Sequence, residues 1–451
     1  MKDVWLLNQM PLNRKSFVKD KYPFRIDLLN ITSFCLNLLL PLLVFLSPSQ
    51  LGYHIWPDWS LIFGIRVDYL APTFFLSDLL IFSIFVGTII LLFLGDRQKQ
   101  FLQLKKTFSW KKLLPVGGLV ILNIILSVNP LNSLIFSLRL VELLFLGAYI
   151  VFFNPLEENQ WFYFPLTLSV IFFGLVGFMQ FLKGGTLGGL LYYLGERSFT
   201  TSSSGISLVN LLGQERLRAY STFPHPNAFA GFFGLAVLIL IVGKNLSPKL
   251  KTFAVVAALV FMAFTFSRLA CGVLFLVLVS YLLFKNKQTL LVKAFKGILL
   301  LTFIVSLLSL LISKNLNNLN MYSQSVSYRL FSIKAAGKIF EKHPLIGVGL
   351  NNFIPVMVET NKGDNSVWFL QPAHNTYLLL FSETGLVGLL LVYFLLLQLV
   401  SEIAKSKRTE YLFPLLFVLL TAILDHYWLT LNQNRFLLTI FLAAILKPKR
   451  V

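Results

Sequence analysis

His374 is the residue of this chain best suited to move a proton. It lies in the segment Ala373-His374-Asn375-Thr376-Tyr377, directly before a long apolar run. The ordinary pKa of histidine is near neutrality, so His374 is a candidate general base. A single histidine in this position is more often structural, and the interpretation depends on the residues around it. His225, which lies between two prolines, is a weaker candidate of the same kind.

Arginine residues stand next to several apolar runs. If these runs are membrane helices, as predicted below, the arginines lie on the same side of the membrane as His374. They are Arg197, Arg216, Arg218, Arg268, Arg329 and Arg435. A single arginine at a helix end can simply extend to the lipid headgroups. Several arginines on one face favour an anionic ligand, because charge at the membrane boundary is costly and arginine binds phosphate through two parallel hydrogen bonds.

Other charged residues have simpler explanations. Arg139 and Glu142 are three residues apart on one helical face and are expected to pair inside the bundle. Asp68 and Asp78 lack a clustered set of further ligands, so a metal site is not supported. The chain has no glycine-rich phosphate loop followed by Lys and Ser or Thr, which excludes ATP hydrolysis by that route. The energy for any reaction must therefore come from an activated substrate.

The elements that position these residues are membrane helices. The 451 residues are 56% hydrophobic and only 13% charged, and continuous apolar runs of about 20 residues recur, the length that crosses a bilayer as a helix. We predict an all-α, polytopic bundle of about twelve transmembrane helices. The predicted ranges are 28–46, 74–94, 113–128, 131–153, 162–182, 226–243, 252–266, 269–284, 294–312, 376–398, 411–430 and 436–447.

The loop charges predict the orientation of the bundle. With twelve spans, every strongly basic loop falls on the side of both termini, which is the cytoplasmic side by the positive-inside rule. These loops explain much of the net charge of +20 without a nucleic-acid partner. Cys35 and Cys271 both lie in apolar runs, so a disulfide framework is not expected. Residues 1–27 are polar and do not resemble a cleavable signal peptide.

Two long loops on the outer side divide the predicted chain. The order is a cytoplasmic arm (1–27), an N-terminal transmembrane bundle (28–182), an extracytoplasmic loop (183–225), transmembrane helices (226–312), a large extracytoplasmic loop with an amphipathic helix (313–375), and C-terminal transmembrane helices with a basic tail (376–451). Loops of this length usually carry a functional site or are disordered. We predict the amphipathic helix around Tyr328–Glu341 and place the broken run 51–64 at the membrane interface.

Four segments resemble, in order and spacing, the O-antigen ligase and polymerase superfamily of bacterial lipid-linked glycan transferases, which also includes protein O-oligosaccharyltransferases. The resemblance covers about residues 216–397, and the N-terminal half matches mainly in hydropathy. The segments are Arg218–Asn227, Phe264–Ala270, Arg329 with His343–Phe353, and Ala373–Tyr377 continuing through Glu383–Gly388.

The resemblance implies an enzyme with a catalytic cavity on the extracytoplasmic face. Members transfer a glycan from undecaprenyl pyrophosphate to a sugar or protein hydroxyl, with no metal, nucleotide or other cofactor. The essential histidine of the superfamily corresponds to His374, and its essential arginines correspond to Arg268 and Arg329 and, less directly, to Arg218.

The chemistry of these side chains fits such a transfer. Arg268 and Arg329 would stabilise the charge that develops on the leaving pyrophosphate. His374 would take the proton from the acceptor hydroxyl, and a single displacement without a protein nucleophile predicts inversion at the anomeric carbon. The residues expected to bind substrate are Arg216, Arg218, His225, Asn375 and Tyr377.

Several functions remain open at this point. A ligase is the leading hypothesis, and a polymerase of the same superfamily is the closest alternative. A polyprenyl-glycan transporter or flippase would instead place charges through the midplane, and a scaffold protein would bind glycolipid without chemistry. The expected partners are the lipid-linked glycan donor, a glycan, lipid-core or protein acceptor, and the bilayer of the bacterial inner membrane.

Overall fold

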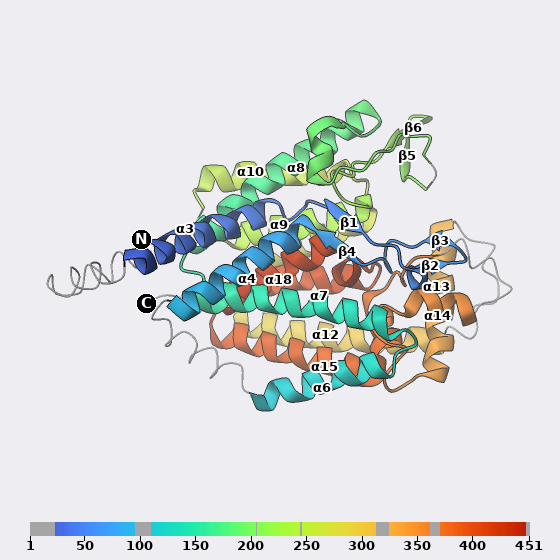
Figure 1. Ribbon diagram of the computed structural model, residues 1–451. Coiled ribbons are helices and arrows are strands. Elements are labelled where there is room, and N and C mark those ends of the chain that lie inside the picture. The colour runs from blue at the N-terminus through green and yellow to red at the C-terminus, as the bar shows by residue number, and fades with distance from the viewer. Residues whose placement is uncertain are drawn as a thin grey trace.

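The computed structural model is a bundle of helices with short strands and loops at one end (Figure 1). It describes residues 23–94, 110–203, 205–243, 246–312, 324–360 and 370–447. Most of the predicted N-terminal arm, the basic loop at 95–109 and the end of the basic tail lie outside the described residues. The described chain is mainly helical, as expected for an all-α membrane protein.

Six helical stretches in the described chain are long and apolar enough to cross a membrane. Each has the roughly 20 residues that a crossing requires. They are Asp27–Phe45 in α3 (Pro23–Phe45), α4 (Leu76–Leu94), α7 (Pro130–Ala148) with η2 (Tyr149–Phe153), η3 (Asn159–Tyr163) with α8 (Phe164–Lys183), Gln288–Leu310 in α12 (Gln288–Ile312), and α15 (Thr376–Lys405).

Shorter helices complete the bundle. They are α6 (Trp110–Ile125), α9 (Pro226–Val242), α10 (Pro248–Ala263), α11 (Arg268–Phe284), α16 (Leu412–Ala422), α17 (Tyr427–Thr430) and α18 (Asn432–Leu446). A helix therefore lies in each of the twelve predicted ranges, although the number of membrane crossings stays a prediction. The range 411–430 is divided, because residues 423–426 separate α16 from α17.

The helix α9 lies inside the bundle and is apolar on all sides. Nearly all of its residues are buried, and it packs against α8, α10, α11, α16 and α18. Gly231 leaves room for the ring of Tyr427, since a Cβ at this position would lie 2.4 Å from that ring. This close packing holds the start of α17, and therefore the polar turn before it, against α9.

At the end of the bundle opposite the start of α3, the connections between helices form further short helices and strands (Figure 1). Helix α13 (Gln324–Lys342) confirms the predicted helix in the second long loop, whereas α14 (Phe353–Thr360) was not predicted. The predicted interfacial run 51–64 contains strands and η1 (Asp58–Ser60), and η4 (Gly189–Leu194) lies in the first long loop. The antiparallel strand pairs are β1 (Gly52–His54) with β4 (Thr73–Phe75), β2 (Leu61–Ile62) with β3 (Ile65–Arg66), and β5 (Leu208–Leu211) with β6 (Gln214–Leu217).

Helix α15 is interrupted at Gly385, whose φ of 65° and ψ of −168° are not helical. Segment 343–349 lies against the interruption and supplies hydrogen-bond partners for the backbone there. Because backbone groups at membrane depth must be paired within the protein, this segment is part of the frame of the bundle. The hydrogen bonds run from Val348 N to Ser382 O, from Gly349 N to Glu383 O, from Leu386 N to Pro344 O and from Val387 N to Leu345 O.

Candidate active site

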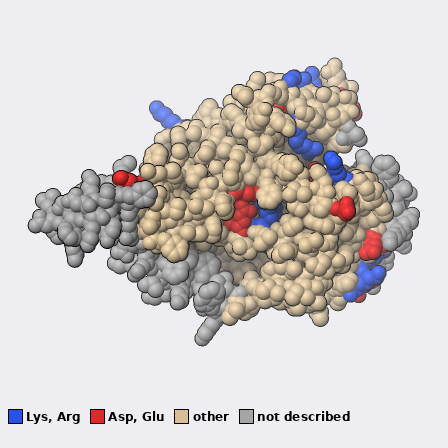
Figure 2. Space-filling view, in the orientation of Figure 1, with Lys and Arg blue, Asp and Glu red and all other residues tan. Residues whose placement is uncertain are grey.

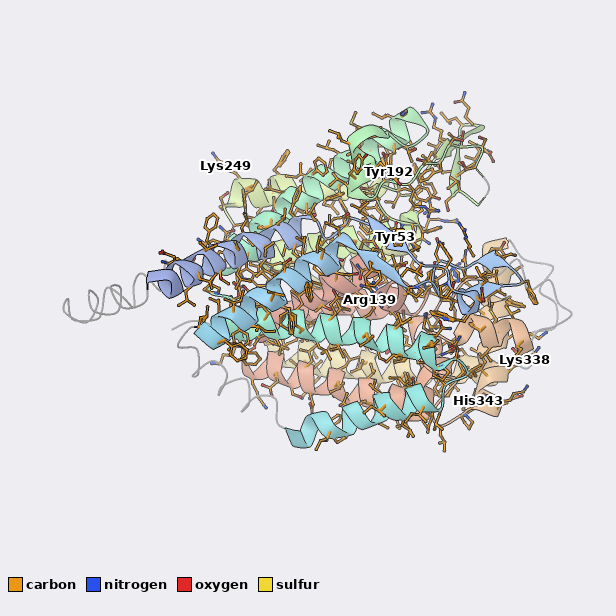
Figure 3. The ribbon with its side chains drawn as sticks, viewed as in Figure 1. Tyr53, Arg139, Tyr192, Lys249, Lys338 and His343 are labelled. Carbon is orange, nitrogen blue, oxygen red and sulfur yellow. The ribbon has the colours of Figure 1, made fainter. Side chains whose placement is uncertain are left out.

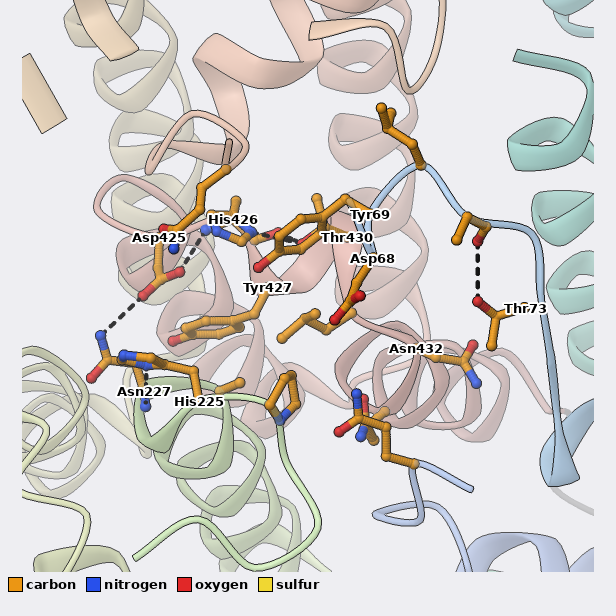
Figure 4. A pocket seen from close by; sticks show the side chains of 18 of the residues that line it. Asp68, Tyr69, Thr73, His225, Asn227, Asp425, His426, Tyr427, Thr430 and Asn432 are labelled. Atoms are coloured by element: carbon orange, nitrogen blue, oxygen red, sulfur yellow. Dashed lines mark hydrogen bonds between the residues drawn. The ribbon is translucent and has the colours of Figure 1, made fainter. Parts of the chain in front are cut away.

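A cavity of 890 Å³ lies among the strand-side ends of α9, α15, α17 and α18 (Figure 4). Four of the eight predicted site residues line it, and they come from four different segments. His374 precedes α15, Arg329 belongs to α13, Arg218 follows β6, and His225 precedes α9. The fold thus brings together residues that are up to 156 positions apart in the sequence.

The environment of His374 keeps its imidazole neutral. Burial lowers the pKa of His374 and so does the nearby charge of Arg329, while the carboxylate of Asp425 and a hydrogen bond to the backbone of Pro372 act in the opposite direction. Proline offers only a carbonyl oxygen there, so a ring N–H of His374 donates to it. The other ring nitrogen of the neutral imidazole is then available to accept a proton.

Asp425 is a buried carboxylate beside His374 that the sequence analysis did not single out. Its Oδ1 accepts the backbone N–H of His426 at 2.8 Å, and its Oδ2 accepts from Asn227 Nδ2 at 3.4 Å (Figure 4). Burial raises the pKa of Asp425, and the proximity of His374 partly offsets this. An available signal was the pair Asp425-His426 inside the otherwise apolar range 411–430.

A chain of hydrogen bonds connects Arg218 to this carboxylate. Arg218 Nε donates to Thr265 O at 2.6 Å, and its Nη2 donates to Asn227 Oδ1 at 2.9 Å. The amide of Asn227 then donates to Asp425. Burial lowers the pKa of Arg218, and the nearby Arg268 lowers it further. The fixed guanidinium therefore lies one side chain away from the carboxylate that faces His374.

Two predicted arginines lie outside the cavity lining. Arg268 is the first residue of α11, and its side chain is exposed, although its charge still acts on Arg218. Arg216 is an exposed residue of strand β6. Arg329, in contrast, lines the cavity, and its charge acts on His374, His225 and Asp425.

His225 caps α9 through its side chain. Its Nδ1 accepts the backbone N–H of Asn227 at 3.1 Å, so the proton of the neutral ring is on Nε2, which donates to Ser207 Oγ at 2.9 Å. Burial, followed by the charges of Arg218, His374 and Arg329, lowers the pKa of His225 to about 3. This histidine is therefore neutral near pH 7 and has both ring nitrogens engaged.

Asn375 and Tyr377 have contacts within the protein. Asn375 caps α15, since its side-chain oxygen accepts from Tyr377 N at 2.9 Å and from Leu378 N at 3.0 Å. The phenol of Tyr377 is buried and donates to Leu419 O at 3.0 Å. Neither residue is among those that line the cavity.

The remaining charged candidates are placed as follows. Arg139 forms the expected pair with Glu142 at 3.3 Å and also pairs with Asp78 at 2.5 Å. Asp68 lines the cavity. Within the described part of the chain, His, Cys, Asp and Glu residues form no group of three that could hold a metal ion.

The chain is therefore a polytopic helical membrane protein with a polar, arginine-bearing cavity at one end of the bundle. Residues 253–393 match the family model described as O-antigen ligase, so this part of the chain is similar to the O-antigen ligase superfamily. The matched region runs from α10 into α15 and includes Arg268, Arg329 and His374. Searches of curated proteins and of solved structures found no significant match.

Proposed function

We propose that this protein is a membrane glycosyltransferase that transfers a glycan from undecaprenyl pyrophosphate to an acceptor hydroxyl. The observation that supports this most directly is the meeting of His374, Arg329 and Arg218 in one cavity, since a base and fixed cations are what the transfer needs. The superfamily and the apolar helices favour the bacterial inner membrane. The basic loops favour an extracytoplasmic position for the cavity.

The proposed reaction is a single displacement at the anomeric carbon. The acceptor oxygen forms a bond to this carbon while its proton passes to the free ring nitrogen of His374. The bond from the anomeric carbon to the pyrophosphate oxygen breaks, and its electron pair leaves with the pyrophosphate. Arg329 and Arg218 stabilise this charge, with Arg268 acting from the edge of the cavity. A single displacement inverts the configuration at the anomeric carbon.

Asp425 completes the proposed mechanism. Its carboxylate faces His374 and stabilises the imidazolium that forms when the acceptor proton arrives. The backbone N–H of His426 and the amide of Asn227 hold the carboxylate in place. The energy of the reaction is that of the lipid pyrophosphate bond, so no nucleotide is needed. The proposed scheme uses no metal, since arginines stabilise the leaving group.

The test is glycan transfer by purified full-length protein in nanodiscs, with a lipid-linked glycan and candidate acceptors. His374→Ala is expected to lower the rate by about 10²- to 10⁴-fold, the contribution of a positioned base. Arg268→Ala is expected to lower the rate because it removes a charge that stabilises the leaving pyrophosphate. His343→Ala is the matched control, because His343 is exposed and lies outside the cavity. Transfer at the wild-type rate by both His374→Ala and Arg268→Ala would refute the mechanism.

Ligase and polymerase activities differ in their acceptor. We propose a ligase, with a polymerase of the same superfamily as the alternative. Deletion of the gene followed by analysis of the surface glycan separates them. Loss of a ligase leaves uncapped core together with free lipid-linked polymer, whereas loss of a polymerase leaves single repeat units.

A further inference from the structure

The loop between α3 and α4 forms one wall of the candidate active-site cavity. It carries strands β1 to β4, and Figure 3 labels Tyr53 on β1. Figure 2 shows charged side chains of both signs at the end of the molecule that bears these strands. His54, Asp68 and Tyr69 of the loop line the cavity, and the ring of His54 stacks on that of Trp56 at 5.6 Å. None of them has a part in the proposed transfer, so this wall is available to a second ligand.

Asp68 and Tyr69 lie in a turn that is anchored on both sides. Val67 and Leu70 are buried in the core, and the backbone N–H of Leu70 donates to Val67 O at 2.9 Å. The side chain of Asn351 donates from Nδ2 to Tyr69 O at 3.1 Å. Because the flanking apolar residues are fixed in the core, the two residues between them are held at the cavity wall (Figure 4).

Tyr69 is separated from the candidate base by one side chain. Its ring packs edge-on against the ring of His426, with the centroids 5.6 Å apart. His374 packs edge-on against the same ring at 5.1 Å. A ligand that presents one hydroxyl to His374 can therefore contact Tyr69 and Asp68 with its neighbouring atoms.

The side chains of this wall match the hydroxyls of a sugar. Asp68 is exposed, and its carboxylate has no hydrogen bond or ion pair with another described residue, so its two oxygens can accept from two neighbouring hydroxyls. Burial raises the pKa of Tyr69, and the charges of Asp425 and Asp68 raise it further, whereas Arg197 lowers it. The phenol therefore keeps its proton and can donate. The rings of Tyr69 and His54 add apolar faces for the C–H groups of a sugar ring.

The charge of the wall distinguishes it from the arginine-bearing part of the cavity. Arg218 and Arg329 suit the anionic donor, whereas a carboxylate repels phosphate. Asp68 and Asp425 both act on Tyr69, so this part of the cavity disfavours an anion and favours an uncharged ligand with several hydroxyls.

We propose that Asp68 and Tyr69 bind the acceptor, and that the acceptor is an uncharged pyranose with two neighbouring hydroxyls beside the one that reacts. The role of this sugar as acceptor rests on the proposed function, whereas the sugar site itself rests on the geometry of the loop. An isolated serine or threonine hydroxyl would not use the site, because it offers no neighbouring hydroxyls to Asp68.

The test measures binding of the methyl pyranosides of glucose, galactose and mannose, in both anomeric forms, to full-length protein in nanodiscs. Donor is omitted and EDTA is present. Asp68→Ala is expected to raise the Kd of the bound pyranosides about tenfold or more, the loss of hydrogen bonds to a charged group. Asp68→Asn is expected to be intermediate, because the amide keeps one acceptor oxygen. Asp58→Ala is the matched control, since Asp58 is an exposed carboxylate of the same loop outside the cavity.

Three results of this measurement would overturn the proposal. They are an unchanged Kd in Asp68→Ala, the absence of binding by every pyranoside, and binding that requires an added divalent cation, which would make Asp68 a metal ligand.

The transfer assay separates the sugar site from the proposed function. Asp68→Ala is expected to raise the KM for a sugar acceptor by the same factor and to leave kcat and the KM for the lipid-linked donor unchanged, as loss of uniform binding does. An equal rise in the KM for the donor would indicate a distorted cavity and contradict the proposal. If Asp68→Ala weakens pyranoside binding but the wild type transfers no glycan, the proposed function fails and the sugar site stands. If the wild type transfers glycan and Asp68→Ala keeps its KM for the acceptor, the sugar site alone fails.

A measurement on the wild type covers the case in which Asp68→Ala does not fold. A methyl pyranoside that carries a diazirine is expected to label the loop 52–75 at Asp68 or Tyr69. Labelling confined to other segments would overturn the proposal without reference to any variant.

Discussion

Replacing Asp425 with asparagine tests the part of the site that the sequence analysis missed. The substitution keeps the shape of the side chain. It also keeps an oxygen that can accept from His426 N, which lies 2.8 Å from Asp425 Oδ1 in the wild type. It removes the negative charge that faces His374 and places an NH₂ group opposite Asn227 Nδ2, a donor at 3.4 Å. Asn227 cannot simply turn over, because its Oδ1 already accepts from Arg218 at 2.9 Å.

The expected loss follows from these contacts. A hydrogen bond to a charged group, such as that from Asn227 to Asp425, contributes about 1.5 to 3 kcal/mol, which corresponds to roughly 10- to 150-fold in rate when its loss affects only the transition state. The carboxylate raises the pKa of His374, so its removal lowers this pKa. A general base loses activity when acid protonates it. The pH at which activity falls is therefore expected to be lower in Asp425→Asn than in the wild type.

The assay is the pH dependence of kcat for glycan transfer, with thermal unfolding in detergent as a check on folding. Asp58→Asn is the matched control, because Asp58 is an exposed carboxylate outside the cavity. If Asp425→Asn folds and keeps both the wild-type kcat and the wild-type pH profile, the assignment of Asp425 as the partner of His374 is wrong.

Three further predictions follow from the structure. Treatment with EDTA is expected to leave the transfer rate unchanged, and a strict requirement for added divalent ions would return Asp68 to consideration as a ligand. Gly385→Ala is expected to lower the Tm clearly, because a Cβ would lie 2.2 Å from the backbone of Leu345 at a φ of 65°; an unchanged Tm would contradict the helix break. For His225, whose pKa falls from 6.5 to about 3 on folding, only the unfolded state gains a proton as the pH drops below about 6.5, so acid destabilises the wild type. His225→Asn is expected to keep the helix cap and to reduce this acid sensitivity, as measured by Tm between pH 4 and 7.

The helices could be predicted from the sequence because each apolar run is long enough to define its own element. The turn at 423–426 could not, since the apolar residues on both sides outweigh the pair Asp425-His426 in a range read as one span. The short α14 has only eight residues and contains Pro355, so its local sequence does not distinguish it from a loop. In both cases the packing against distant segments, rather than local composition, decides the structure.

The sequence analysis named two of the residues that line the cavity most usefully, His374 before α15 and Arg329 in α13. Proximity in the sequence was a poorer guide. Tyr377 is only three residues from His374, yet it lies within the first turn of α15, where successive side chains point in different directions, and it reaches Leu419 O in the core. The buried position of Arg435 could not be predicted from the sequence, because an arginine at a helix end commonly extends to the headgroups.

The interruption of α15 at Gly385 has a consequence for the biogenesis of the protein. The backbone groups at the break are paired by residues 343–349, which precede α15 in the chain. Asn123 of α6 closes the same junction, since its amide donates to Glu383 O at 2.9 Å. A membrane insertase that released α15 before these partners had arrived would expose unpaired backbone to lipid. Final assembly of this region therefore requires both residues 343–349 and Asn123 of α6 to be packed against α15.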